Sequence, residues 1–77
     1  MNVLAHAPGL MAFATAVEAG SFSAAARVLG TSPSAVSKGV ARLEQRFGVR
    51  LFQRSTRVLS LTQEGAAYYE RIAPLLR

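Results

Sequence analysis

Cationic and hydroxyl side chains gather in one part of this sequence, between residues 32 and 57. Basic side chains recur there about every four residues, and Glu44 is the only carboxylate among them. The chain carries a formal net charge of +5 at pH 7, and its sequence pI is about 11.2. An excess of positive charge in a domain of this size indicates a polyanionic partner, most often a nucleic acid. The basic residues concerned are Lys38, Arg42, Arg46, Arg50, Arg54 and Arg57.

The groups that enzymes use for catalysis are scarce. The chain has no cysteine, and its single histidine, His6, lies in a weakly patterned stretch near the N-terminus. The four acidic residues are all glutamates and are scattered along the chain. These residues suggest neither a nucleophile with its base nor a metal site. We therefore expect that the chain is not an enzyme and that this domain uses no cofactor.

Length and hydropathy limit the class of protein. A chain of 77 residues is one small domain or the first part of a longer chain. The hydrophobic fraction of 51% argues for a packed core and against disorder. No apolar run approaches the length of a membrane span, and no targeting segment is recognisable. We expect a cytoplasmic protein that does not contact a membrane, which the absence of cysteine also fits.

The residues from 32 to 47 are predicted to form the helix that positions the cationic side chains. Ser32 is suited to cap its N-terminus, and Pro33 is suited to the first helical position. Gly48 is suited to end it in the left-handed conformation. Apolar residues recur at i, i+4, i+7 and i+11 and form one stripe, made by Val36, Val40, Leu43 and Phe47.

The outer face of this helix carries short hydrogen-bonding groups and one cation in its first two turns. Ser34, Ser37 and Lys38 lie off the apolar stripe. A helix needs such a face to enter a DNA groove and to meet base edges and phosphates. Taken alone, the face could equally be a solvated helix surface.

The preceding residues add a second helix and a tight turn. Ser21 is the expected N-cap of a short helix over residues 22–29, although Ser23 could also serve. Gly30 closes it, and only Thr31 separates Gly30 from Ser32. Two helices joined by a short turn with glycine form a helix-turn-helix, whose second helix enters the major groove.

A first helix is expected from Pro8 to the residue before Gly20, with residues 1–7 frayed. It is nearly uncharged, so we interpret it as scaffold. Its buried stripe is predicted to contain Leu10, Phe13, Ala14 and Val17.

Residues 49–54 and 58–61 favour strands, and the polar residues between them favour a turn. We predict a short two-stranded hairpin with Arg54 and Arg57 at its tip. A basic hairpin beside a helix-turn-helix is a wing, which can lie along phosphates or enter the minor groove.

A last helix is predicted after Thr62, with Glu64 in its first turn. Its apolar residues follow a spacing that suits contact with another helix, although packing on its own domain alone is the alternative. Pro74 should kink this helix or end it near Ala73. The residues of the predicted seam are Ala66, Tyr69, Ile72, Ala73 and Leu76.

Five stretches together resemble the N-terminal domain of LysR-type transcriptional regulators: residues 20–26, 34–38, 43–52, 54–57 and 61–65. The resemblance implies a mainly α fold, a winged helix-turn-helix over residues 1–61 with a short two-stranded wing. Residues 62–77 then begin a C-terminal linker helix that pairs two subunits. It also implies binding to double-stranded DNA as a homodimer, or as a tetramer in a full-length protein. A small-molecule inducer is expected only in a C-terminal domain that is missing from this chain.

The resemblance also implies roles for individual residues. Positions early in the recognition helix, about residues 33–47, read the major groove, and Arg42 and Arg54 face phosphates. Arg57, on a wing of about residues 50–61, corresponds to the arginine that enters the minor groove. The full set of predicted DNA-binding residues is Ser32, Pro33, Ser34, Ser37, Lys38, Arg42, Arg54, Thr56 and Arg57.

Three residues depart from the family pattern. Pro33 stands where a glutamine is common, so an amide contact to a base is lost there. Gly39 lies inside the recognition helix, where we expect it to let the DNA backbone approach closely. Pro74 affects the length and straightness of the linker helix. The alternatives to DNA binding are a protein-docking winged helix, which needs no cationic face, and, more weakly, a membrane-surface role.

Overall fold

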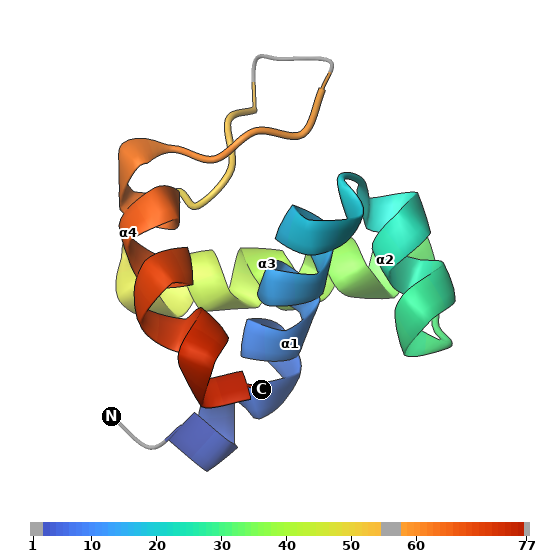
Figure 1. The fold of residues 1–77 in the computed structure, drawn as a ribbon, viewed down its shortest axis with the longest axis horizontal. Coiled ribbons are helices and arrows are strands. Elements are labelled where there is room, and N and C mark those ends of the chain that lie inside the picture. Colours follow the sequence, from blue (N-terminus) through green and yellow to red (C-terminus); the bar gives the residue numbers. More distant parts are fainter. Residues whose placement is uncertain (1–2, 55–57, 77) are drawn as a thin grey trace.

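The computed structural model describes the backbone of residues 3–54 and 58–76, and the side chains of residues 8–54 and 58–75. Four α-helices follow one another within these ranges: α1 (Val3–Ala19), α2 (Phe22–Leu29), α3 (Pro33–Phe47) and α4 (Gln63–Ile72). A short 3₁₀ helix, η1 (Ala73–Leu76), continues from α4. Figure 1 shows α3 lying across the molecule, with α1 beside it and the segment between α3 and α4 projecting from one end.

The first helix begins earlier than expected. α1 already includes Val3, and Pro8 lies inside it rather than at its start. The prediction that residues 3–7 are frayed is therefore wrong, while residues 1 and 2 lie outside the described residues. Pro8 is close enough to the N-terminus that it removes only the backbone bond to the carbonyl of Leu4. The residues before it include Ala5 and Ala7, which favour helix.

The helix-turn-helix forms as predicted. The Oγ of Ser21 accepts a hydrogen bond from the Ala24 N–H at 3.0 Å, and α2 ends at Gly30, whose φ is 69°. The Oγ of Ser32 accepts from the Ala35 N–H at 3.1 Å and so caps α3. Gly48, also with a φ of 69°, ends α3 in the left-handed conformation. Each helix therefore begins and ends at the residue that the local sequence indicated.

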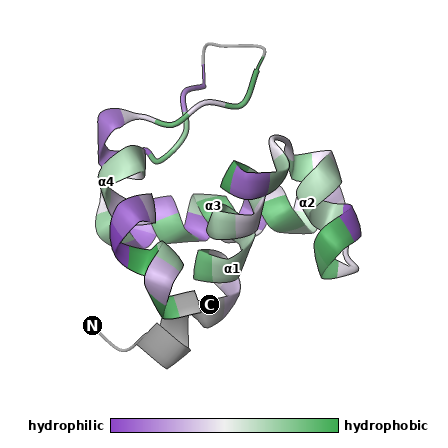
Figure 2. Cartoon of the chain, in the orientation of Figure 1, coloured by the Kyte–Doolittle hydropathy of each residue, from purple (hydrophilic) through white to green (hydrophobic). Residues whose placement is uncertain are grey.

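The core lies between α1 and the elements that surround it. α1 is hydrophobic nearly all round where it is coloured in Figure 2, which suits a helix that packs against α2, α3 and α4. Phe13 is fully buried, and its ring meets Phe52 edge-on with 5.4 Å between ring centroids. The buried core residues include Leu10, Phe13, Ala16, Ala25, Ala26, Val36, Val40, Leu43, Leu51, Phe52 and Ile72.

Gly39 serves the contact between α1 and α3. A Cβ added at Gly39 would lie 3.3 Å from the Cβ of Ala12, and one added at Gly9 would lie 3.3 Å from the Gly39 carbonyl oxygen. The two helices thus cross closely at glycines. The expectation that Gly39 lets the DNA backbone approach is wrong, because its missing side chain faces α1.

α4 packs back on the body of the domain. The ring of Tyr68 stacks on Phe47 at the end of α3, with centroids 4.7 Å apart and planes at 3°. The hydroxyl of Tyr69 donates a hydrogen bond to the Glu18 carboxylate of α1 at 2.8 Å. The α-helix ends at Ile72, and the turn that contains Pro74 is 3₁₀. Of the two outcomes expected from Pro74, the structure thus shows the α-helix ending next to Ala73.

The segment between α3 and α4, residues 48–62, has little regular pairing among its described residues. Phe52 and Leu61 form a single antiparallel bridge. The Gln53 N–H also donates to the Ser60 carbonyl at 2.8 Å. The described part of the predicted two-stranded wing is therefore a bridge without extended strands. Leu51 and Phe52 are both buried, so core packing replaces the in-and-out alternation that a ladder needs.

Candidate nucleic-acid interface

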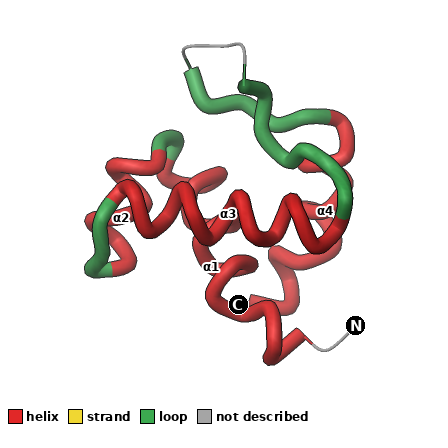
Figure 3. The backbone as a smooth tube through the Cα atoms, turned by 180° about the vertical axis from the view of Figure 1, so that it is seen from behind, coloured by secondary structure: helices red, strands yellow, loops and turns green. Residues whose placement is uncertain are grey.

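The outer face of α3 is open to solvent. In Figure 3 this helix runs across the near side of the molecule. Ser37 is half-buried, and the other predicted contact residues of α3 and its cap are exposed. Ser32 caps the helix through its Oγ, and this hydrogen bond fixes the position from which the side chain can contact a ligand. The exposed ones are Ser32, Pro33, Ser34, Lys38 and Arg42.

The shape of this face would allow the base edges at the bottom of a DNA groove to approach the helix closely. Ser34 and Ala35 are exposed and short, and the long cationic side chains of Lys38 and Arg42 follow one and two turns later. A hollow of about 330 Å³ lies alongside and is lined by both cations together with Thr31. Short groups at the helix start and cations behind them are the arrangement that base edges flanked by phosphates require.

The charge of this face is not neutralised from within. Lys38, Arg42 and Arg46 are exposed, and within the described residues none of the three forms an ion pair. The ion pairs that do occur there involve Arg50 and Arg54, which both lie beyond the end of α3. The cationic row on α3 is thus available to a polyanion.

Glu44 is a buried residue at the edge of this face, and the sequence interpretation did not predict its burial. Only 5% of its side chain is exposed, and its Oε2 accepts hydrogen bonds from the backbone N–H groups of Leu51 at 2.8 Å and Phe52 at 3.3 Å. Its Oε1 accepts from the guanidinium of Arg54 and lies 3.8 Å from that of Arg50. The carboxylate therefore joins the end of α3 to the start of the segment 48–62.

A sequence signal for this burial did exist. Glu44 follows Val36 and Val40 at intervals of four residues, so it continues the buried side of α3 rather than the solvated one. A carboxylate on the apolar side of a helix indicates a buried partner. By charge alone, Glu44 stands out only as the single carboxylate among the cations of residues 32–57.

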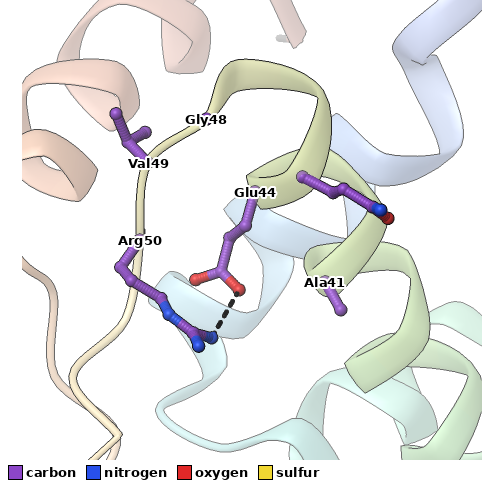
Figure 4. A pocket seen from close by; sticks show the side chains of 6 residues that line it. Ala41, Glu44, Gly48, Val49 and Arg50 are labelled. Atoms are coloured by element: carbon purple, nitrogen blue, oxygen red, sulfur yellow. Dashed lines mark ion pairs between the residues drawn. The ribbon is translucent and has the colours of Figure 1, made fainter.

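An open hollow of about 370 Å³ lies beside Glu44 at the end of α3. Figure 4 shows the Glu44 carboxylate and the Arg50 guanidinium pointing toward one another there, with their ion pair dashed. The two charged groups face each other rather than an outside ligand. The hollow is lined by Ala41, Glu44, Gln45, Gly48, Val49 and Arg50.

The structure places only part of the predicted wing. Arg54 was predicted to face phosphates; its guanidinium is held by Glu44, while 40% of its side chain remains exposed. It can therefore present its outward donors to an anion without leaving the carboxylate. Thr56 and Arg57 lie outside the described residues, and their predicted roles stay predictions.

The predicted seam residues do not share one free face. Ala66 is exposed and Tyr69 is half-buried, whereas Ile72 and Ala73 are 8% and 7% exposed and pack within the domain. The alternative interpretation, packing on the same domain, thus describes Ile72 and Ala73. The side chain of Leu76 lies outside the described residues. Dimerisation through these residues stays a prediction.

The part of the chain that the structure describes has neither a candidate metal site nor a helix able to cross a membrane. Within residues 8–54 and 58–75, whose side chains are described, no three His, Cys, Asp or Glu side chains lie together as a metal site would require. None of the helices described is both long enough and apolar enough to span a bilayer.

Comparison with known proteins identifies the family. Residues 9–66 match the family described as "Bacterial regulatory helix-turn-helix protein, lysR family". The chain is 52% identical over 68 residues to the HTH-type transcriptional regulator CrgA of Neisseria meningitidis, an overlap of 88% of this chain and 23% of that protein. It is 49% identical over 74 residues to the HTH-type transcriptional regulator PerR of Escherichia coli, covering 94% of this chain and 25% of PerR. The chain thus spans about a quarter of the length of these regulators.

Solved structures agree with the sequence match. The fold superposes on the BenM DNA-binding domain in its complex with benA site 1 DNA, with a TM-score of 0.86 and 30% identity. That match covers 99% of this chain and 81% of the BenM chain. A second match, to the CbnR DNA-binding domain in complex with DNA, has a TM-score of 0.81 and 35% identity over 88% of this chain and 78% of that one. The chain therefore belongs to the lysR family of bacterial regulatory helix-turn-helix proteins.

Proposed function

We propose that this chain is the DNA-binding domain of a bacterial transcriptional regulator and that it binds double-stranded DNA sequence-specifically. The observation that carries the proposal is the exposed face of α3. It combines short hydroxyl groups with the cations Lys38 and Arg42, which no carboxylate of the described residues neutralises. The same fold is found in domains solved in complexes with DNA, which supports this assignment.

In this proposal the recognition helix α3 lies in the major groove. Pro33, Ser34, Ser37 and Lys38 meet base edges, because they occupy the first two turns of the exposed face. Lysine can donate to the acceptors of guanine, and serine can bond to several bases. Arg42, one turn further along, contacts phosphate, as does the N-terminal end of the helix at Ser32.

The segment 48–62 lies along the flanking DNA. Arg54 contacts phosphates with the donors that Glu44 leaves outward, and Thr56 supports the same contact. Arg57 enters the minor groove, where a narrow A·T-rich stretch has the strongest negative potential. These wing roles rest on the family resemblance and, for Arg54, on the 40% of its side chain that is exposed.

The parent regulator is proposed to act as a cytoplasmic homodimer, or as a tetramer when full length. Pairing uses the C-terminal helix, with Ala66, Tyr69, Ile72, Ala73 and Leu76 as contact residues. Ile72 and Ala73 are already buried within their own domain, so among the described residues of this set the area left for a partner helix lies at Ala66 and Tyr69. An inducer binds in another domain, which fits regulators about four times as long as the overlap. As a regulator, the protein has no enzymatic role.

Selection of duplexes from a random DNA pool tests the central claim. The chain should enrich a defined half-site, and its affinity for the selected duplex should fall by orders of magnitude between about 50 and 200 mM salt. Replacement of Arg42 by alanine should weaken binding to all duplexes alike and reduce the salt slope by roughly one unit. A random output from the pool, or an affinity that does not respond to salt, would refute the proposal.

A further inference from the structure

The carboxylate of Glu44 makes two separate connections, one through each oxygen. Oε2 accepts the backbone N–H groups of Leu51 and Phe52, at 2.8 and 3.3 Å. Oε1 accepts from the Arg54 guanidinium. The first connection holds the backbone that leaves α3, and the second holds one cationic side chain on it. The two can therefore be changed independently.

The two backbone hydrogen bonds alone do not require a charged side chain at this position, because a neutral oxygen could also accept them. Only 5% of the Glu44 side chain is exposed. Taking a charge out of water costs free energy, and an ion pair offsets this cost only when its geometry is good. Well-packed apolar residues often replace such pairs with no loss of stability. Here an apolar side chain would remove the acceptor of the Leu51 and Phe52 N–H groups, and it could not hold the planar guanidinium of Arg54 in one orientation.

The position of Arg54 makes that orientation relevant to the ligand. Its side chain is 40% exposed, so the guanidinium is held on one side by Glu44 and open on the other. Glu44 itself stands on α3, two residues after Arg42 on the helix proposed to enter the groove. One buried carboxylate thus links the recognition helix to a cation of the flanking segment.

We propose that Glu44 is a positioning residue for DNA recognition. It holds Arg54 and the start of the segment 48–62 at one fixed place relative to α3, so that both parts engage the duplex in a single register. This inference rests on the proposed function. Without the contact to Glu44, Arg54 still adds positive charge, but its position is no longer fixed relative to α3. Its contact to the flanking DNA then no longer depends on where α3 sits in the groove.

The substitution Glu44→Gln separates the two connections. Glutamine keeps one oxygen for the N–H groups of Leu51 and Phe52, and it turns an amide NH₂ toward the Arg54 guanidinium, which cannot accept a hydrogen bond. Glu70→Gln is the matched control, because it makes the same change in side chain and net charge at an exposed position of α4. Arg54→Lys is the second test, since it keeps the charge but loses the planar fork.

The measurement is the ratio of affinities for two duplexes: the one that the unmodified chain selects from a random pool, and a scrambled duplex of equal length. We expect Glu44→Gln to lower this ratio on the order of tenfold, as for residues coupled in one network. Affinity for the scrambled duplex should hold or rise, because a negative charge is lost. Glu70→Gln should leave the ratio unchanged, and Arg54→Lys should lower it at constant scrambled affinity.

A purely structural role for Glu44 predicts a different result. Loss of folded protein would lower affinity for both duplexes by the same factor, and that outcome, or an unchanged ratio, overturns the inference. If Glu44→Gln does not fold, Arg54→Lys decides alone: a ratio within twofold of the unmodified chain refutes the positioning role. If the unmodified chain selects no sequence at all, the proposed function itself fails and this inference fails with it.

Discussion

The helix-turn-helix unit and the segment that follows it are held in place by different kinds of contact. In α2 and α3 each helix has a side-chain cap at its start and a left-handed glycine at its end, and each buries an apolar face. The described part of the segment 48–62 buries Leu51 and Phe52 and has one antiparallel bridge, with further hydrogen bonds to Glu44 and from Thr62. The first region is stabilised by repeated caps and apolar contacts, and the described part of the second by two core side chains and a small number of specific hydrogen bonds.

This difference determines how each region should respond to substitution. Loss of one cap or one apolar contact in the helix-turn-helix leaves the others in place, so the effect is graded. In the segment a single atom often has two partners, as the Thr62 hydroxyl does: it accepts from the Gly65 N–H and donates to the Arg50 carbonyl. A change there removes two connections at once.

The largest effect is expected in the core, at a residue of α1 against which the segment 48–62 and α4 both pack. Phe13→Ala should reduce the free energy of unfolding by about 3–5 kcal/mol, because the ring is fully buried and contacts both Phe52 and Tyr69. Urea denaturation followed by circular dichroism measures the loss. Met11→Ala, on the exposed side of the same helix, should cost much less. Equal losses for the two variants would contradict the placement of the core.

Glycine-to-alanine substitutions should show the clearest difference in stability between the two regions. At Gly65 a Cβ would lie 2.0 Å from the Leu51 carbonyl oxygen, so the backbone must move, at a typical cost of about 1–3 kcal/mol or more. At Gly39 the nearest atom is 3.3 Å away, and the helix gains about 1 kcal/mol of propensity, so Gly39→Ala should be close to neutral.

Hydrogen exchange locates the Gly65 effect. The Thr62 amide donates to the Leu51 carbonyl at 3.0 Å and should lose protection in Gly65→Ala before the amides of α3 do. Uniform loss of protection in both regions would show that the segment and the helix-turn-helix unfold as one unit.

The two regions should also recognise different parts of the DNA site. Lys38→Ala should cost about 1–3 kcal/mol of binding free energy and relax the preference at one position of each half-site, because a donor to a base edge is lost. Arg57→Ala should instead weaken the preference for A·T-rich flanking sequence. Binding of both variants to singly substituted duplexes provides the measurement. An even loss across all duplexes for both would mean that neither side chain reads sequence.

The smallest effects are expected at the two caps. Ser32→Ala removes one hydrogen bond and should cost about 1 kcal/mol of stability. Thr62→Ala removes two and should cost about twice as much. Thermal unfolding of the two variants side by side gives the comparison, and a larger loss at Ser32 would reverse it.

The helix-turn-helix could be predicted from sequence because its determinants are local. Ser21 and Ser32 bond to amides three residues away, and Gly30 and Gly48 follow directly on the helices that they end. Such side chain–backbone contacts can be predicted from a few consecutive residues of the sequence. The exposed recognition face followed from the same helical periodicity.

The rest depended on contacts between distant residues. The hydrogen-bond partners of Glu44 lie seven to ten residues further along, and Tyr69 bonds to Glu18 across 51 residues. Position 65 has no room for a side chain because the backbone of Leu51 lies against it, and the local sequence does not show this contact. Strand-like composition over residues 49–54 and 58–61 likewise predicted a ladder, whereas Leu51 and Phe52 are both buried and the described residues there form a single bridge.

The two tyrosines have an optical consequence. The chain has no tryptophan, and both tyrosines lie on α4, one stacked on Phe47 of α3 and the other bonded to Glu18 of α1. Its intrinsic fluorescence therefore originates from a single helix, whereas its far-ultraviolet circular dichroism sums over all of them. An event that lifts α4 from its neighbours would change tyrosine emission while leaving most of the helical signal in place. The protein thus contains its own spectroscopic reporter for the docking of α4, and no label needs to be added.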